Sequence, residues 1–238
     1  YILHFLTDIN TVGLYNAGYK IGMLMMLVVI GFNMAWQPFF LNKKCEEREY
    51  IAKVTTVTIS LLAFLWILIL IWSEDMVKLK IGSVSLLGKE FWESTPIIPI
   101  IALAYIFHAI YLLQLPGIYL LEKSGWNAWI RGIGAVANII LNFLLIPKFG
   151  IMGAASATCI SFILMSVILY LLNNKIFSVK YEKIKLVTIM ITSIIIWIAV
   201  AKFSISHSHK IALSLIYPII IFFTKTIQYK KFIFFIST

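Results

Sequence analysis

The sequence predicts an all-α integral membrane protein, a bundle of about seven transmembrane helices. Of its 238 residues 61% are hydrophobic and only 13% are charged, and the mean hydropathy is +0.96. Soluble domains carry roughly 25% charged residues, so lipid must solvate much of this surface. The apolar residues also form long continuous runs, whereas the strands of a membrane β-barrel would alternate over about ten residues.

The apolar runs follow one another with short polar breaks. A stub at residues 1–10 resembles the tail of a helix, so we expect the chain to be the C-terminal part of a longer protein. A run of about 20 residues spans the hydrocarbon core at 1.5 Å per residue, and the last two runs are marginal by this measure. The predicted spans are Val12–Leu41, Ala52–Trp72, Pro96–Leu121, Trp126–Ile146, Ile151–Leu172, Leu186–Ala201 and Ile211–Thr224.

The connecting loops predict the orientation. If successive helices alternate in direction, loops 42–53, 122–131, 173–185 and 225–238 lie on one side and hold more than twice as many basic residues as the opposite set. Cytoplasmic loops are enriched in Lys and Arg, so this side is expected to be cytoplasmic, the C-terminus included. The net charge of +10 is thus explained by orientation, and no nucleic-acid partner is expected. The long outer loop, residues 73–95, is either a short surface helix or a plain connection.

The stretch from Trp126 to Asn173 predicts a membrane-buried helical hairpin. Two apolar runs are separated only by the break at residues 147–150, which is too short for anything but a tight turn. Small residues at the start of the second run allow another helix to approach closely. Prolines at positions 38, 116 and 218 predict kinks, which serve either as hinges or as ordinary packing features.

The placement of polar residues argues against enzyme chemistry. All ten acidic residues lie in loops or at helix ends, so no proton relay, cation cage or acid–base pair is predicted within the membrane. Cys45 and Cys159 have no partner at disulfide or metal-binding spacing. His207 and His209 fit a solvated loop better than a metal site. We therefore expect no cofactor, no metal and no catalytic residue.

One basic residue lies inside an apolar run. Lys20 follows Asn16 by one helical turn and adjoins Tyr19, so this face of the first run is polar. A lysine within the membrane is costly unless it is paired or hydrated. It either contacts an anion in a water-filled cavity or extends to the outer interface.

A second polar stripe follows the fourth run, where Arg131, Asn138 and Asn142 recur at helical spacing. The two asparagines either bond neighbouring helices or line a cavity. His108 lies one turn after Tyr105 and fits a satisfied core histidine better than a cavity residue. The candidate substrate-binding residues are therefore Lys20, Asn16, Tyr19, Arg131, Asn138 and Asn142.

Two segments carry a resemblance to a known family. TVGLYNAGYKIG (residues 11–22) and ANIILNFLLIPKFGIMGAASATCISF (residues 137–162) resemble the C-terminal half of bacterial polysaccharide-biosynthesis flippases, in the multidrug/oligosaccharidyl-lipid/polysaccharide exporter superfamily. The N-x3-N…IP-x-x-G-x-x-GAA-x-AT pattern is similar to that of multidrug exporters too. The resemblance implies the second bundle of a two-bundle transporter at residues 1–173, with a partial first helix at 1–10, and two additional helices at 174–238.

The resemblance implies transport by alternating access in the bacterial cytoplasmic membrane. The implied substrate is an undecaprenyl-diphosphate-linked oligosaccharide, carried for O-antigen, capsule or similar surface polysaccharide. Lys20 matches the place of a cationic residue in related lipid flippases, which favours a diphosphate contact. Other polysaccharide-assembly membrane proteins are further candidate partners. The alternatives are a multidrug/cation antiporter, which would want a membrane carboxylate, or a multispanning polysaccharide polymerase or acyltransferase.

Overall fold

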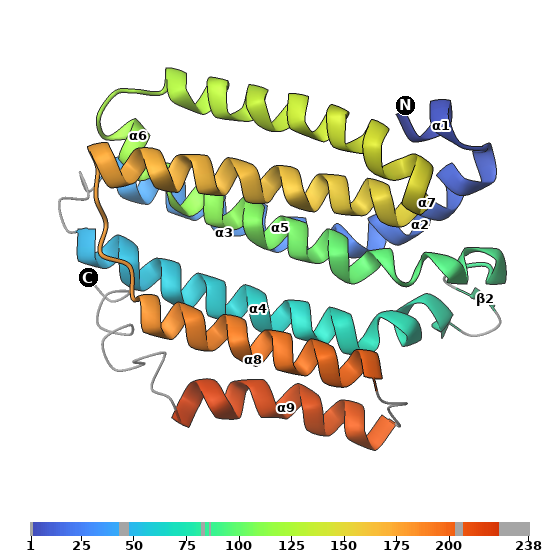
Figure 1. Cartoon of the computed structure of the whole chain (residues 1–238). Helices are drawn as coiled ribbons and strands as arrows, with labels where there is room; N and C mark the ends of the chain where they lie inside the picture. Colours follow the sequence, from blue (N-terminus) through green and yellow to red (C-terminus); the bar gives the residue numbers. More distant parts are fainter. Residues whose placement is uncertain (1, 43–47, 82–83, 86, 203–206, 224–238) are drawn as a thin grey trace.

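The computed structural model describes residues 2–42, 48–81, 84–85, 87–202 and 207–223. Cys45 and the C-terminal loop at 225–238 lie outside these ranges. The described part is a helical bundle with one small hairpin of two-residue strands (Figure 1). Its elements are α1 (Ile2–Leu6), α2 (Ile9–Gly22), α3 (Leu24–Asn42), α4 (Arg48–Lys78), β1 (Lys80–Ile81), β2 (Val84–Ser85), the 3-10 helix η1 (Lys89–Ser94), α5 (Ile97–Leu113), α6 (Pro116–Tyr119), α7 (Gly125–Ile176), α8 (Lys183–Lys202) and α9 (His207–Phe223).

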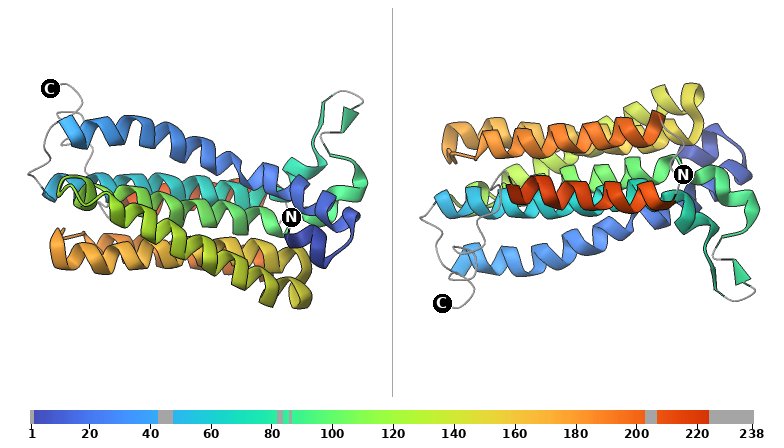
Figure 2. Two further views of the ribbon diagram at one scale, coloured as in Figure 1. Left: turned by 90° about the horizontal axis from the view of Figure 1, so that it is seen from above. Right: turned by 90° about the horizontal axis from the view of Figure 1, so that it is seen from below.

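Helix α5 lies at the centre of the bundle. Its sequence, IIPIIALAYIFHAIYLL, is apolar on every face, as expected of a helix buried all round. It packs against α2, α3, α4 and α7, and Ile98, Ile101 and Tyr111 are fully buried. Views from above and below place α3 on one side of α4 and α5, and α7 on the other (Figure 2).

The predicted hairpin is confirmed in α7. Its 52 residues would extend about 78 Å as a straight helix, well beyond a bilayer, but the chain folds back at Gly150. Gly150 has φ 54° and ψ −130°, a backbone conformation that residues other than glycine rarely adopt. The two arms, residues 125–149 and 151–176, therefore run antiparallel beside each other (Figure 1).

The first predicted span is divided in two. Helix α2 ends at Gly22 and α3 begins at Leu24. Met23 forms a tight turn between them, in which its carbonyl accepts a hydrogen bond from the Met26 N–H, three residues further along the chain. Gly18 and Gly22 lie against the chain that starts α5: an added Cβ would be 2.8 Å from the carbonyl oxygen of Ser94 or of Ile98, respectively. This close packing depends on tertiary contacts, which the continuous hydropathy of residues 12–41 does not reveal.

Within the described residues, five helices are long and apolar enough to cross a membrane. They include α3, α4, the α5–α6 segment, α7 and α8, and the stretch His209–Ile221 in α9 is a shorter apolar helix. Because α7 contains two arms, more than five crossings fit, but the expected count of seven remains a prediction. The kink expected at Pro116 is confirmed, since α5 ends at Leu113 and α6 begins at Pro116.

The two sets of loops lie at opposite ends of the bundle. One end of the bundle holds the last turn of α3, the first turns of α4 and α8, and the first and last turns of α7 (Figure 1). The opposite end holds the Gly150 turn and the β1–β2 hairpin. We call the first the basic end, after the lysines and arginines of its loops. The segment 73–95 is more than a plain connection, because it contains the end of α4, the strand pair and the short 3-10 helix η1. Whether η1 lies on the membrane surface stays a prediction.

Helices α8 and α9 pack against α4. The Tyr217 hydroxyl of α9 donates to the Ser60 carbonyl of α4 at 3.0 Å. Nearer the end of the bundle opposite the basic end, the Lys210 ammonium forms an ion pair with Asp75, and its Nζ lies 5.7 Å from the centre of the Trp72 ring. His207 lies beside the same carboxylate, with Nδ1 4.0 Å from it. The predicted loop at His207 and His209 is wrong, because both residues belong to the first turn of α9, although both are exposed.

Candidate functional site

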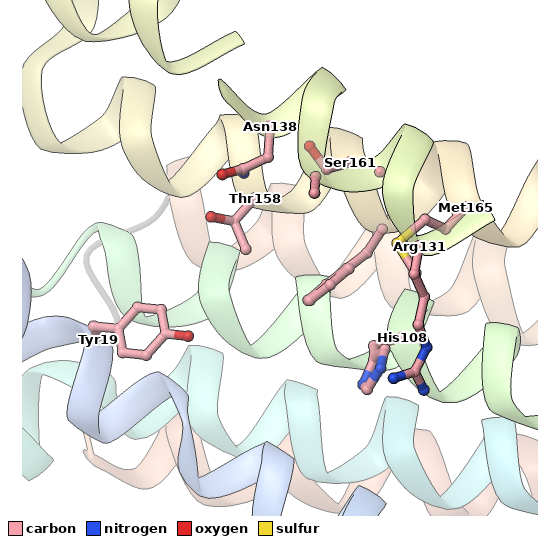
Figure 3. Close-up of a pocket in the computed structure, with 10 residues that line it drawn as sticks. Tyr19, His108, Arg131, Asn138, Thr158, Ser161 and Met165 are labelled. Atoms are coloured by element: carbon pink, nitrogen blue, oxygen red, sulfur yellow. The ribbon is translucent and has the colours of Figure 1, made fainter. Parts of the chain in front are cut away.

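A cavity of about 430 Å³ lies between α2, α5 and the two arms of α7 (Figure 3). This volume falls within the roughly 300–1,000 Å³ typical of small-molecule sites. The lining combines one cation, polar side chains, aromatic rings and small residues. Its members are Tyr19, His108, Arg131, Gly134, Ala135, Asn138, Thr158, Ser161, Phe162 and Met165.

The hairpin of α7 builds two walls of this cavity. The turn at Gly150 sets Thr158 and Ser161 of the second arm opposite Asn138 of the first. The arms are also in close contact at Gly134, where an added Cβ would lie 2.4 Å from the Met165 sulfur. Glycine at this position allows the arms to pack tightly toward the basic end while the polar residues beyond it line an open space.

Arg131 supplies the positive charge of the cavity. Its guanidinium carbon lies 6.0 Å from the centre of the Tyr111 ring, an attractive cation–π arrangement. The Tyr111 hydroxyl donates to the Asn127 side-chain oxygen, and the Asn127 amide nitrogen donates to the Tyr119 hydroxyl at 2.7 Å. Asn127 thus fixes the ring beneath the guanidinium. Among the described residues, no carboxylate forms an ion pair with Arg131.

His108 lies beside Arg131 within an aromatic wall (Figure 3). Its imidazole stacks on Phe162 with ring centres 4.9 Å apart, and lies nearly parallel to Tyr111 at 6.3 Å. Its Nδ1 atom is buried without a hydrogen-bond partner in the described part of the chain. The interpretation of His108 as a satisfied core histidine is therefore not what the structure shows. The wall continues to Tyr105, whose hydroxyl bonds that of Tyr19 at 2.6 Å.

The other end of the cavity is neutral and polar. The Asn142 amide nitrogen donates to the Asn138 carbonyl at 2.8 Å and to its side-chain oxygen at 3.0 Å. This orients Asn138 so that its own amide nitrogen can serve the cavity. Thr158 and Ser161 donate to carbonyls one turn back, at 3.2 and 2.7 Å, and so offer oxygen acceptors.

The charge balance of the lining selects the ligand class. One guanidinium is present, and no Asp or Glu lines the cavity. Although Arg131 is exposed, its guanidinium attracts an anionic ligand in this cavity, and a cationic ligand would meet repulsion without a counter-charge. The arrangement suits binding and orientation of an anion that also carries hydroxyl groups.

The structure brings together three of the six candidate residues named from sequence. Tyr19, Arg131 and Asn138 line the cavity. Asn142 is buried behind Asn138 and acts through it. Asn16 and Lys20 share an exposed face of α2, outside the cavity lining, because the Gly18–Gly22 face packs on η1 and α5.

Sequence reasoning missed the contributions of the second α7 arm. Thr158, Ser161, Phe162 and Met165 recur at helical spacing on one face. Their region was interpreted as a packing surface because of its small residues, which is also correct for Gly153, Ala154 and Ala155, all buried. The signal that could have found them is the match between this polar face and the Arg131–Asn138 stripe across a tight turn.

The chain is similar to one named flippase. It is 26% identical over 183 residues to the probable low-salt glycan biosynthesis flippase Agl15 of Haloferax volcanii, a match covering 75% of this chain and 37% of that protein. The chain thus spans little more than a third of that relative's length. No family model matches the chain, and no solved structure gives a significant match. The similarity to a flippase, together with the apolar helices, supports a multi-pass membrane protein.

Proposed function

We propose that this chain belongs to a flippase that moves an undecaprenyl-diphosphate-linked oligosaccharide across the cytoplasmic membrane for surface polysaccharide assembly, by alternating access. The observation that carries the proposal is the cavity with an unpaired guanidinium and no carboxylate. A lipid-linked glycan offers both the anionic phosphate and the hydroxyl-rich sugar that such a lining favours. The similarity to Agl15 supports the same class of cargo at a coarse level.

The same observation argues against the multidrug/cation antiporter. A cationic drug needs a carboxylate or an aromatic cage without a competing positive charge. Here the aromatic wall of His108 and Phe162 lies next to Arg131. The polymerase and acyltransferase alternatives need reacting groups in the loops expected to be external. The candidate there, His207, lies 4.0 Å from the Asp75 carboxylate, so this contact gives it a role other than catalysis.

Lys20 and Asn16 are proposed as a second contact for the diphosphate. They lie one turn apart on an exposed face of α2, and α2 also supplies Tyr19 to the cavity. If the chain is one bundle of a two-bundle transporter, as proposed, this face would border the central path between the bundles. Lys20 would then attract the diphosphate along the path, and Arg131 would hold it within the bundle.

Reconstituted transport tests this function. The protein encoded by the full gene is placed in vesicles that contain a fluorescent undecaprenyl-diphosphate oligosaccharide, and the labelled lipid reaching the outer leaflet is measured with a membrane-impermeant quencher. Uptake of a cationic dye is measured in parallel. We expect lipid translocation without dye transport. Dye transport without lipid translocation would reverse the choice in favour of the cation exporter.

A further inference from the structure

We propose that the cavity holds its ligand in one orientation, with a phosphate at Arg131 and His108 and the adjoining sugar at Asn138 and Thr158. This inference rests on the proposed function and adds the polarity of the bound substrate. It also assigns His108 and Thr158, which the sequence analysis did not place in the site, to opposite ends of the ligand. The two ends are visible in Figure 3, with Arg131 and His108 together and Asn138 and Thr158 together.

The first end is built to hold a phosphate. A guanidinium presents several donors in a plane that matches phosphate oxygens. Arg131 is placed by the Tyr111 ring below it, and that ring is in turn fixed by Asn127. The His108 imidazole, held between Phe162 and Tyr111, adds a second nitrogen-bearing group on the same side.

The second end is built for neutral hydroxyl groups. Asn138 is oriented by Asn142 and offers a donor, whereas Thr158 and Ser161 have already used their hydroxyl protons and offer acceptors. A sugar hydroxyl both donates and accepts, so a mixed set of this kind suits it. A second phosphate would find acceptors facing it and no cation among the residues lining this end.

The separation of the two ends requires an extended ligand. Arg131 and Asn138 lie on the same arm of α7, seven residues apart and thus about 10.5 Å along the helix axis. One phosphate cannot reach both groups. Since α7 begins at the basic end of the bundle and Arg131 follows in its second turn, the phosphate points toward that end and the sugar toward the Gly150 turn.

Binding to three lipid probes tests the orientation. The protein encoded by the full gene is held in nanodiscs, and its affinity is measured for undecaprenol, undecaprenyl diphosphate and undecaprenyl-diphosphate-N-acetylglucosamine. Arg131→Gln should weaken binding of both diphosphate probes about ten-fold or more. Arg131→Lys, which keeps the charge, should lose less. Asn138→Ala should weaken only the sugar-bearing probe, about 2–10-fold.

The matched control is Arg48→Gln. Arg48 is the other arginine of the chain, bonds the Ser178 carbonyl at 3.1 Å and lies outside the cavity lining. It should leave all three affinities unchanged, and thermal unfolding should show that each variant is folded. Equal loss of both diphosphate probes in Asn138→Ala, or full affinity in Arg131→Gln, overturns the orientation. If the wild-type protein translocates the glycan lipid but Arg131→Gln binds both diphosphate probes normally, the proposed orientation is wrong and the proposed function stands. If the wild-type protein does not bind the diphosphate probes more tightly than undecaprenol, the proposed function is wrong.

Discussion

The Asn142 side chain donates to Asn138 twice, to its carbonyl at 2.8 Å and to its side-chain oxygen at 3.0 Å. The two residues are one turn apart in the first arm of α7, and only Asn138 lines the cavity. The sequence pattern gave both asparagines the same candidate role, whereas in the structure one lines the cavity and the other bonds to it. In the proposed site Asn138 would contact the ligand, and Asn142 would fix the orientation of its side chain.

The first prediction follows from this pair. Asn142→Ala removes both hydrogen bonds and frees the Asn138 amide to rotate, so translocation should fall by about as much as in Asn138→Ala. Because the two residues act as one unit, the double variant should lose no more than either single variant. Translocation rates of the four proteins complete the cycle. Additive losses would show that Asn142 acts independently of Asn138.

The second prediction concerns the break between α5 and α6. Asn173 is buried, and its amide nitrogen donates to the Gln114 carbonyl at 2.8 Å, where Pro116 interrupts the helical bonding. Asn173→Ala removes this bond, while the Gly117 N–H still donates to the same carbonyl at 3.3 Å. The unfolding free energy should therefore fall by about 0.5–1.5 kcal/mol. The neighbour Asn174 is exposed, so Asn174→Ala should change stability little. Thermal unfolding in detergent measures the stability of both variants. Equal effects of the two substitutions would show that the Asn173–Gln114 hydrogen bond does not stabilise the break between α5 and α6.

The third prediction tests the close contact between the two α7 arms. An added Cβ at Gly134 would lie 2.4 Å from the Met165 sulfur, whereas at Gly132 nothing lies within 4 Å. Gly134→Ala should therefore destabilise the hairpin by about 1–3 kcal/mol through overpacking. Gly132→Ala should instead stabilise the helix by up to about 1 kcal/mol.

Met165→Ala supplies the internal control for this contact. In the Gly134→Ala background it removes the obstructing side chain and should recover part of the lost thermal stability. If Gly134→Ala were as stable as Gly132→Ala, the arms would not be in the described contact.

Particular residues show how far the sequence determined the fold and the site. The hairpin was predictable because its signals, Pro147 and Gly150, are local, and the kink at Pro116 was predictable for the same reason. The division at Met23 was not, because it accompanies the packing of Gly18 and Gly22 on distant residues. A hydropathy profile averages over many neighbouring residues, so it does not show which of them pack against distant parts of the chain.

The candidate site shows the same division. Arg131 and Asn138 were found because their spacing on one helix places them on one face. Thr158 and Phe162 were not found, since which face of the second arm meets the first depends on the geometry at Gly150. Lys20 had the stronger sequence argument, yet it lies outside the cavity lining while Arg131 lies within it.

The fourth prediction tests the direction of the bundle in the membrane. Lys180 lies at the basic end, between α7 and α8, and Lys89 lies at the opposite end in η1; both side chains are exposed. Single cysteines at these positions are introduced after Cys45 and Cys159 have been replaced. Because basic loops remain in the cytoplasm, an impermeant thiol reagent should label Lys89→Cys in intact cells and Lys180→Cys only after lysis. The reverse pattern would invert the orientation.

The fifth prediction separates Lys20 from the other exposed lysines. Lys20 lies on α2 next to Tyr19 of the cavity, whereas Lys148 is exposed beside the α7 turn. If Lys20 draws the diphosphate into the transport path, Lys20→Ala should reduce surface-glycan export, and Lys20→Arg should retain most of it because the charge remains. Lys148→Ala should export normally. Export is measured as surface polysaccharide per unit of membrane-inserted protein, so that a loss of insertion is not counted as a loss of transport. Undiminished export by Lys20→Ala would confine anion binding to the Arg131 end of the cavity.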